Sequence, residues 1–168
     1  DSLTREVGLF PYLDYDTLSF KDSLAYGLHK PAQMDDTFVL HRAQAEIYRR
    51  LVDGENVILS APTSFGKSRI IDALIASGKY ANIAVVVPTI ALIDETRRRL
   101  AAFKDRYKIV TQVSQEPGDR NIFVFTAERI NAYEKLPRID FFVVDEFYKI
   151  GALSEDESRT VALNQAFY

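Results

Sequence analysis

One stretch decides the fold of this chain: Ser60-Ala61-Pro62-Thr63-Ser64-Phe65-Gly66-Lys67-Ser68. It follows a short apolar run at 57–59 and leads into an amphipathic run at 69–75. A buried strand, a tight loop ending in Gly-Lys-Ser and a following helix form the arrangement that holds a nucleoside triphosphate. The sequence therefore predicts a phosphate-binding loop between a strand at 57–59 and a helix over 67–77.

Each part of this loop suits the binding of phosphate. The loop turns backbone N–H groups inward, and the helix start adds unpaired donors and the positive end of its dipole. We expect the Lys67 ammonium to reach the β- and γ-phosphates and the Ser68 hydroxyl to bind Mg²⁺. Gly66 lets the backbone approach the phosphates closely. The predicted nucleotide-binding residues of the loop are Ala61, Pro62, Thr63, Ser64, Phe65, Gly66, Lys67 and Ser68.

The first loop position departs from the strict pattern G-x-x-x-x-G-K-[ST], because Ala61 stands where the pattern has glycine. The alternative is an ordinary strand-to-helix turn that happens to contain Gly-Lys-Ser. A Mg²⁺-binding acid after a later strand favours the nucleotide site, and Asp145-Glu146 directly follows the apolar run 141–144. We expect Asp145 to bind Mg²⁺ and Glu146 to orient or deprotonate the attacking water.

Composition restricts the class of protein. The 168 residues suit one domain with a sizeable core. No apolar stretch approaches the ~20 residues that span a membrane, and the first residues lack the features of a signal peptide. The sequence has no cysteine, which excludes disulfides and thiolate metal sites and favours an intracellular, cytoplasmic protein. The formal net charge of −3 means that any nucleic-acid contact must be confined to one face.

Helical and strand-like runs alternate along most of the chain. Helical spacing predicts helices over 41–52, 67–77, 90–103 and 126–136. Short apolar runs predict strands at 57–59, 83–87, 109–113, 122–125 and 141–144. This alternation predicts an α/β fold with three layers, a mainly parallel sheet and helices on both faces.

We predict a main domain at 38–168 and an N-terminal extension at 1–37. The extension is too apolar for a disordered tail, and packing on the main domain is favoured over a partner surface. The chain does not begin with Met, and its only Met is Met34. We therefore interpret the sequence as a piece of a longer protein.

Ligands of parallel α/β sheets bind at the carboxyl ends of the strands. The loop at 61–68, Pro88-Thr89, Thr126 and Asp145-Glu146 each directly follow a predicted strand. We expect them to meet at one edge of the sheet and to form one site.

Two of these segments carry a family resemblance. The loop 61–68 and Val144-Asp145-Glu146-Phe147-Tyr148 resemble motifs I and II of the DEAD/DEAH-box-type helicases of superfamily 2. The resemblance covers about residues 38–150. It implies a RecA-like P-loop NTPase domain that uses ATP and Mg²⁺.

Weaker matches extend the resemblance. Gln44 resembles the glutamine that reads the adenine edge in this family, and Pro88–Leu92 resembles motif Ia. Thr126–Arg129 resembles the T-P-E-R motif. The resemblance implies that Thr89, Thr126 and Arg129 contact the nucleic-acid backbone of DNA or RNA. The departures from the family pattern are Ile90 for Arg, Glu95 for Gln, Ala127 for Pro, and Phe147-Tyr148 after Asp-Glu.

The resemblance implies the N-terminal motor domain of an ATP-dependent helicase or translocase. In the family, a second RecA-like domain supplies arginine fingers, and such a finger is worth about 10³–10⁵ in rate. We find no second RecA-like domain and no Ser-Ala-Thr motif III, so we expect these residues alone to hydrolyse ATP very slowly. One alternative is a P-loop ATPase that acts as a switch or protein remodeller without nucleic acid. A small-molecule phosphotransferase is less favoured, because no acceptor site or lid is visible.

The most basic region comprises Arg97–Arg99, Lys104, Arg106 and Lys108. It has two interpretations, attraction of nucleic-acid phosphates or a solvated helix face balanced by Asp94 and Glu95. We favour the balanced face.

Overall fold

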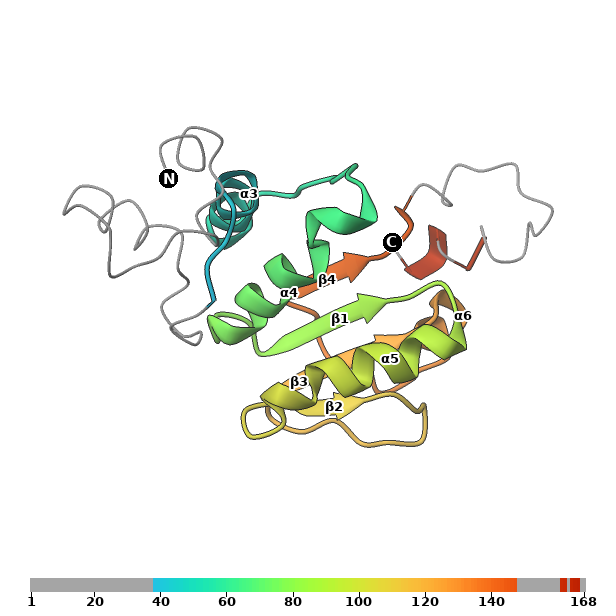
Figure 1. The fold of residues 1–168 in the computed structure, drawn as a ribbon. Coiled ribbons are helices and arrows are strands. Elements are labelled where there is room, and N and C mark those ends of the chain that lie inside the picture. Colours follow the sequence, from blue (N-terminus) through green and yellow to red (C-terminus); the bar gives the residue numbers. More distant parts are fainter. Residues whose placement is uncertain (1–37, 148–160, 163, 167–168) are drawn as a thin grey trace, which may run out of the picture. The chain divides into compact units, whose positions relative to one another are not determined.

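The computed structural model describes residues 38–147, 161–162 and 164–166 (Figure 1). The predicted extension at 1–37 lies outside these residues. The chain divides into two compact units, Asp1–Lys79 and Tyr80–Tyr168, and each is described by itself. In the described part of the chain, no helix has the length and apolar character needed to cross a membrane.

Two helices form the described part of the first unit, α3 (Arg42–Val52) and α4 (Lys67–Ala76). The buried side chains of Leu40, Ala45 and Ala73 pack together, with Phe38 and Tyr48 against them. Gly78 follows the end of α4 with a φ of 66°, and a left-handed glycine at this position commonly ends a helix. Both helices confirm the sequence prediction.

The strand predicted at 57–59 is wrong. Residues 55–62 have no regular secondary structure, and Ile58 is 81% exposed. A strand needs a neighbour to pair its N–H and C=O groups, and the described residues of the first unit contain no other strand. Three apolar residues in succession are therefore not sufficient to make a strand here. The phosphate loop follows an irregular segment instead.

A parallel four-stranded sheet forms the centre of the second unit. Its strands lie in the order β2-β3-β1-β4 and pair in parallel throughout. They are β1 (Asn82–Val86), β2 (Lys108–Val110), β3 (Asn121–Phe125) and β4 (Phe141–Val144). The sheet confirms the predicted α/β class and places four predicted strands within a few residues of their expected positions.

Helices cover the sheet of the second unit. Figure 1 shows α5 (Ile90–Leu100) in front of the sheet. Helix α6 (Ala127–Asn131) packs its buried residues on Phe123 and Phe125, and Tyr133 joins the same cluster. Successive side chains of a strand point to opposite faces, so Val124, the buried residue between these two phenylalanines, faces the other side of the sheet.

Helix α6 is shorter than predicted, because it ends at Asn131 and not near residue 136. Beyond it, Tyr133 N donates to Ile130 O and Leu136 N donates to Tyr133 O. These bonds span three residues, so the chain makes tight turns there. Pro137 disfavours the helical conformation for the residue before it, which is consistent with the early stop.

Strand β2 is also shorter than predicted and ends at Val110. The Gln115 side chain accounts for this end, because its Oε1 accepts hydrogen bonds from Thr111 N at 2.8 Å and Gln112 N at 2.9 Å. A side-chain acceptor thus takes the backbone donors that a longer strand would offer to a neighbour.

We expect Phe123→Ala to lower the free energy of unfolding by about 3–5 kcal/mol, because it leaves a cavity beside Phe125 and Tyr133. Phe123 is fully buried, whereas Phe142 of strand β4 is 46% exposed. The matched control Phe142→Ala should cost no more than about 1 kcal/mol. Urea unfolding followed by circular dichroism measures both variants. Equal losses would show that the core does not lie where the sheet places it.

Candidate nucleotide site and strand-end cluster

The phosphate loop is a single tight turn that leads into α4. Thr63–Phe65 form one turn of 3-10 helix, and Gly66 follows with φ 75° and ψ 41°. This left-handed conformation is strained for residues with a Cβ, so glycine suits the position. Gly66 is also the N-cap of α4, and the N–H groups of the first turn of that helix begin directly after the loop.

Lys67 brings positive charge to the loop. Its Nζ donates hydrogen bonds to Ala61 O at 2.8 Å and to Pro62 O at 3.2 Å. The ammonium therefore lies over the start of its own loop and is held there by neutral carbonyl groups. A phosphate oxygen is a stronger acceptor for an ammonium than a carbonyl is.

The residues of the loop fit a polyphosphate with Mg²⁺. The first turn of α4 contains no acidic residue, so nothing there cancels the positive end of the helix dipole. Ser68 lies in this turn and is exposed. An anion-binding helix start, a lysine and a hydroxyl thus come from adjacent residues, as the sequence predicts.

Gln44 contacts this loop directly. It lies in the first turn of α3 and is 1% exposed. Its Nε2 donates to Phe65 O at 2.7 Å, and its Oε1 accepts a hydrogen bond from His41 N at 2.8 Å. The structure therefore brings the predicted adenine-reading residue to the phosphate loop. Contact with a base stays a prediction.

Arg69 is a contact residue that the sequence analysis missed. Its guanidinium lies over the ring of Phe38, 4.5 Å from the centroid, and its Nη2 donates to Val39 O at 3.2 Å. These contacts join the first turn of α4 to the segment before α3. Nothing in the sequence around Gly-Lys-Ser indicates that the following arginine makes such a contact.

Three of the predicted strand-end residues lie at one edge of the sheet of the second unit. Val86 pairs with Phe125 on one side and with Val144 on the other, so β1, β3 and β4 end level. Asp145 continues this pairing, because its N donates to Val86 O at 2.9 Å. Thr89 and Thr126, which follow β1 and β3, are the N-caps of α5 and α6.

The two acidic residues after β4 adopt an unusual local conformation. Glu146 has a φ of 56°, the single positive φ outside glycine in the described residues. Its N donates to Asp145 Oδ1 at 3.0 Å. Left-handed backbone at a residue with a Cβ costs about 1–2 kcal/mol, and such strain clusters at functional sites. Asp145 is exposed, so a metal ion can reach its carboxylate.

The predicted nucleic-acid contacts differ in their surroundings. Thr89 is exposed, and its hydroxyl accepts a hydrogen bond from Leu92 N at 3.4 Å. Thr126 is only 6% exposed. Arg129 Nη1 donates to Thr111 O at 3.5 Å, so this side chain braces the turn after β2. All three nucleic-acid contacts stay predictions.

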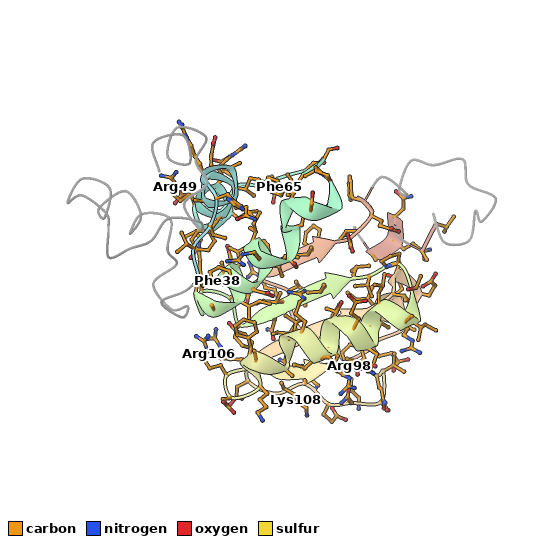
Figure 2. All side chains as sticks on the ribbon, in the orientation of Figure 1. Phe38, Arg49, Phe65, Arg98, Arg106 and Lys108 are labelled. Carbon is orange, nitrogen blue, oxygen red and sulfur yellow. The ribbon has the colours of Figure 1, made fainter. Side chains whose placement is uncertain are left out.

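An acidic side chain neutralises part of the positive charge of the basic region, in line with the favoured interpretation of a balanced helix face. Arg97 and Arg98 pair with Asp94 at 2.6 and 2.5 Å, on exposed surface. The hydrogen bond from Arg97 and the positive charges of both arginines hold the pKa of Asp94 below its usual value. Figure 2 labels Arg98, Arg106 and Lys108 on this region of α5 and β2.

The sequence matches the family model of the DEAD/DEAH box helicases over residues 41–164, which is well over half of the chain. The chain belongs to this family. Its parallel sheet with helices agrees with the RecA-like fold of superfamily 2 helicases, and the matched region is a helicase motor domain. The family is ATP-dependent.

Two curated proteins are similar to the chain. The "Anti-bacteriophage protein B" of Escherichia coli (strain K12) is 41% identical over 98% of this chain and 24% of its own length. The "Helicase POLQ-like" of Caenorhabditis elegans is 32% identical over 70% of this chain and 14% of its own length. The chain thus spans about a quarter or less of these relatives.

We expect the first unit to lose stability as the pH falls, because folding lowers the pKa of the His41 side chain. Partial burial and the positive charge of Arg69 lower the pKa of His41 below its usual value of 6.5. The unfolded chain therefore binds the proton more readily. The stabilising contribution is complete above pH 6.5 and is lost as the pH falls toward the folded-state pKa.

His41→Asn should remove this part of the pH dependence. The measurement is the urea midpoint of the chain and the variant between about pH 8 and about pH 5. Carboxylates titrate in both proteins, so the difference between the two curves reports His41. Parallel curves would contradict the expectation.

Proposed function

We propose that this chain is the N-terminal motor domain of an ATP-dependent nucleic-acid helicase or translocase. The observation that carries the proposal is the loop at 61–68, where a left-handed Gly66, the Lys67 ammonium and the start of α4 lie in one tight turn, an arrangement that suits an anion. Membership of the DEAD/DEAH box helicase family supports ATP as the ligand and a nucleic acid as the track.

The residues of the site suit phosphoryl transfer to water. Lys67 and the N–H groups at the start of α4 neutralise charge on the β- and γ-phosphates. Ser68 and Asp145 are each proposed as Mg²⁺ ligands, and the ion would supply further neutralisation of the phosphate charge. Glu146 orients the attacking water and accepts its proton. The strained backbone at Glu146 supports a functional role for this residue.

Contacts with nucleic acid are proposed for the strand-end edge of the second unit. Thr89 and Thr126 each stand at a helix start, where backbone N–H groups favour phosphate oxygens. Arg129 lies in α6, the helix that Thr126 begins, and supplies positive charge. Contacts of this kind bind the nucleic-acid backbone without recognising the base sequence, which suits movement along DNA or RNA.

The motor needs more than these residues. The γ-phosphate charge must be neutralised from several sides, and we propose that a second RecA-like domain of the full-length chain supplies an arginine finger. The 168 residues alone then bind ATP and Mg²⁺ weakly and hydrolyse ATP very slowly. A nucleic-acid motor works where ATP and its track are found, which supports an intracellular, cytoplasmic protein.

A role in defence against bacteriophage is a second part of the proposal. It is supported by the 41% identity to a protein named for action against bacteriophage, over nearly the whole chain. Expression of the full-length protein in a phage-sensitive bacterium should lower phage plating, and the Lys67→Ala variant should not. Equal plating with both proteins would contradict this role.

We expect the ATPase rate of the full-length protein to rise when single-stranded DNA, duplex DNA or RNA is added. Lys67→Ala should reduce turnover to background, because it removes the charge that neutralises the β- and γ-phosphates. Arg106→Ala is a suitable control, since it removes one positive charge from the basic region. Turnover that no nucleic acid stimulates would favour the alternative of a switch or protein remodeller without nucleic acid.

A further inference from the structure

Polar side chains join the amino ends of three neighbouring strands of the second unit (Figure 1). Asn82 begins β1, Asn121 begins β3, and Asp140 immediately precedes β4. The sheet pairs Asn82 with Asn121, and Asp140 N donates to Asn82 O at 2.9 Å on the other side of β1. The three residues therefore form one row across β3, β1 and β4, which we call the polar row.

The Asp140 side chain holds the start of β1. Its Oδ2 accepts hydrogen bonds from Ala81 N and from Asn82 N, both at 2.9 Å. Asp140 thus contacts Asn82 both as a donor, through its own N–H, and as an acceptor, through its carboxylate. A shift of β4 by one residue would take the carboxylate away from both of these donors.

The polar row continues from β1 to β3. Asn121 Nδ2 donates to Asn82 Oδ1 at 2.8 Å, and Asn82 Nδ2 donates to Arg138 O at 3.2 Å. Asn121 is 1% exposed, and it also bonds Gly118, whose N donates to Asn121 Oδ1 at 2.6 Å. A buried amide favours the one arrangement that satisfies it, since other arrangements leave polar atoms without partners.

The apolar residues of β4 do not select a register by themselves. The whole strand 141–144 has the sequence Phe-Phe-Val-Val, so a shift by one residue would again place apolar side chains on both faces. Register is strongly specified only where polar and apolar residues alternate between a buried and a solvated face. The polar row therefore supplies the register information that this strand lacks.

The register of β4 determines where the acidic residues after it lie. Val144 pairs with Val86, and Asp145 N donates to Val86 O at 2.9 Å. A shift by one residue would move Asp145 by about 3.3 Å along the strand and turn its side chain to the opposite face. Mg²⁺ accepts ligands only at about 2 Å and in octahedral geometry, so such a shift would remove Asp145 from a metal site.

We propose that Asp140 is a positioning residue for Asp145 and Glu146. It fixes the register of β4 against β1 at the amino ends of the strands, and this register sets the place of the acidic residues at the carboxyl end. Asp140 acts through the strand and is not itself a ligand. The inference rests on the proposed roles of Asp145 and Glu146 in the ATP site.

Amide hydrogen exchange on the full-length protein, without nucleotide or metal, tests the register directly. Asp140→Ala removes the side-chain acceptor, and exchange in the segment 141–147 should become about tenfold faster, because the bond from Asp145 N to Val86 O opens more often. Asp140→Asn keeps an oxygen acceptor at the same place and should restore slow exchange. Faster exchange confined to residues 80–82 would show a purely local contact and overturn the inference.

The Mg²⁺ dependence of the ATPase rate is the second readout. Asp140→Ala should raise the Mg²⁺ concentration for half-maximal rate about tenfold, as when the support of a metal ligand is lost, and Asp140→Asn should not. Asp119→Ala removes an exposed carboxylate from the loop before β3. Tyr133→Phe removes the hydrogen bond to Gln115 O and leaves β4 untouched. Both controls should keep the Mg²⁺ requirement of the unmodified protein.

Thermal melting identifies a variant that fails to fold. If Asp140→Ala does so, Asn82→Ala applies the same test, because it interrupts the polar row and leaves Asp140 in place. An unchanged Mg²⁺ requirement in a folded variant of the row would overturn the positioning role. Absence of Mg²⁺-dependent ATPase in the unmodified protein would instead overturn the proposed function, and the exchange data would still report the register.

Discussion

The left-handed backbone at Gly66 is the constraint on which the first unit depends. It lets the chain pass from a single 3-10 turn into α4 and exposes the N–H groups of the helix start. The same residue leaves the space that Gln44 occupies, and Gln44 in turn links α3 to the loop. Helix start, lysine and glutamine thus take their positions from one backbone conformation. Any side chain at this position would disturb all of them together.

The second unit depends on a different constraint, the level ends of its parallel strands. Because β1, β3 and β4 pair in register, the backbone of the sheet brings the residues that follow these strands to one edge. Asp145 is held there by a backbone bond to Val86. The buried rings of Phe123, Phe125 and Tyr133 stabilise the sheet beneath that edge. Packing in the core of the sheet therefore helps to determine where Asp145 and Glu146 lie.

The functions of the candidate site residues stay predictions, whereas the segments that carry them can be compared with the structure. Gly-Lys-Ser and Asp-Glu follow from the chemistry of phosphate and Mg²⁺, which tolerates few substitutes. The strand at 57–59 failed because an apolar run does not reveal whether a pairing partner exists. Strand β2 and helix α6 came out shorter because Gln115 and Pro137 compete with regular structure locally. The Gln44 contact with Phe65 joins positions far apart in sequence, and no spacing rule indicates it.

The two groups of candidate residues differ in charge. The loop of the first unit is positive, through Lys67 and an α4 start without acidic residues. The edge of the second unit carries the carboxylates of Asp145 and Glu146. A polyphosphate alone suits the first group and would be repelled by the second. Anionic phosphate oxygens therefore suit the loop of the first unit, whereas a cation such as Mg²⁺ suits the acidic residues of the second unit.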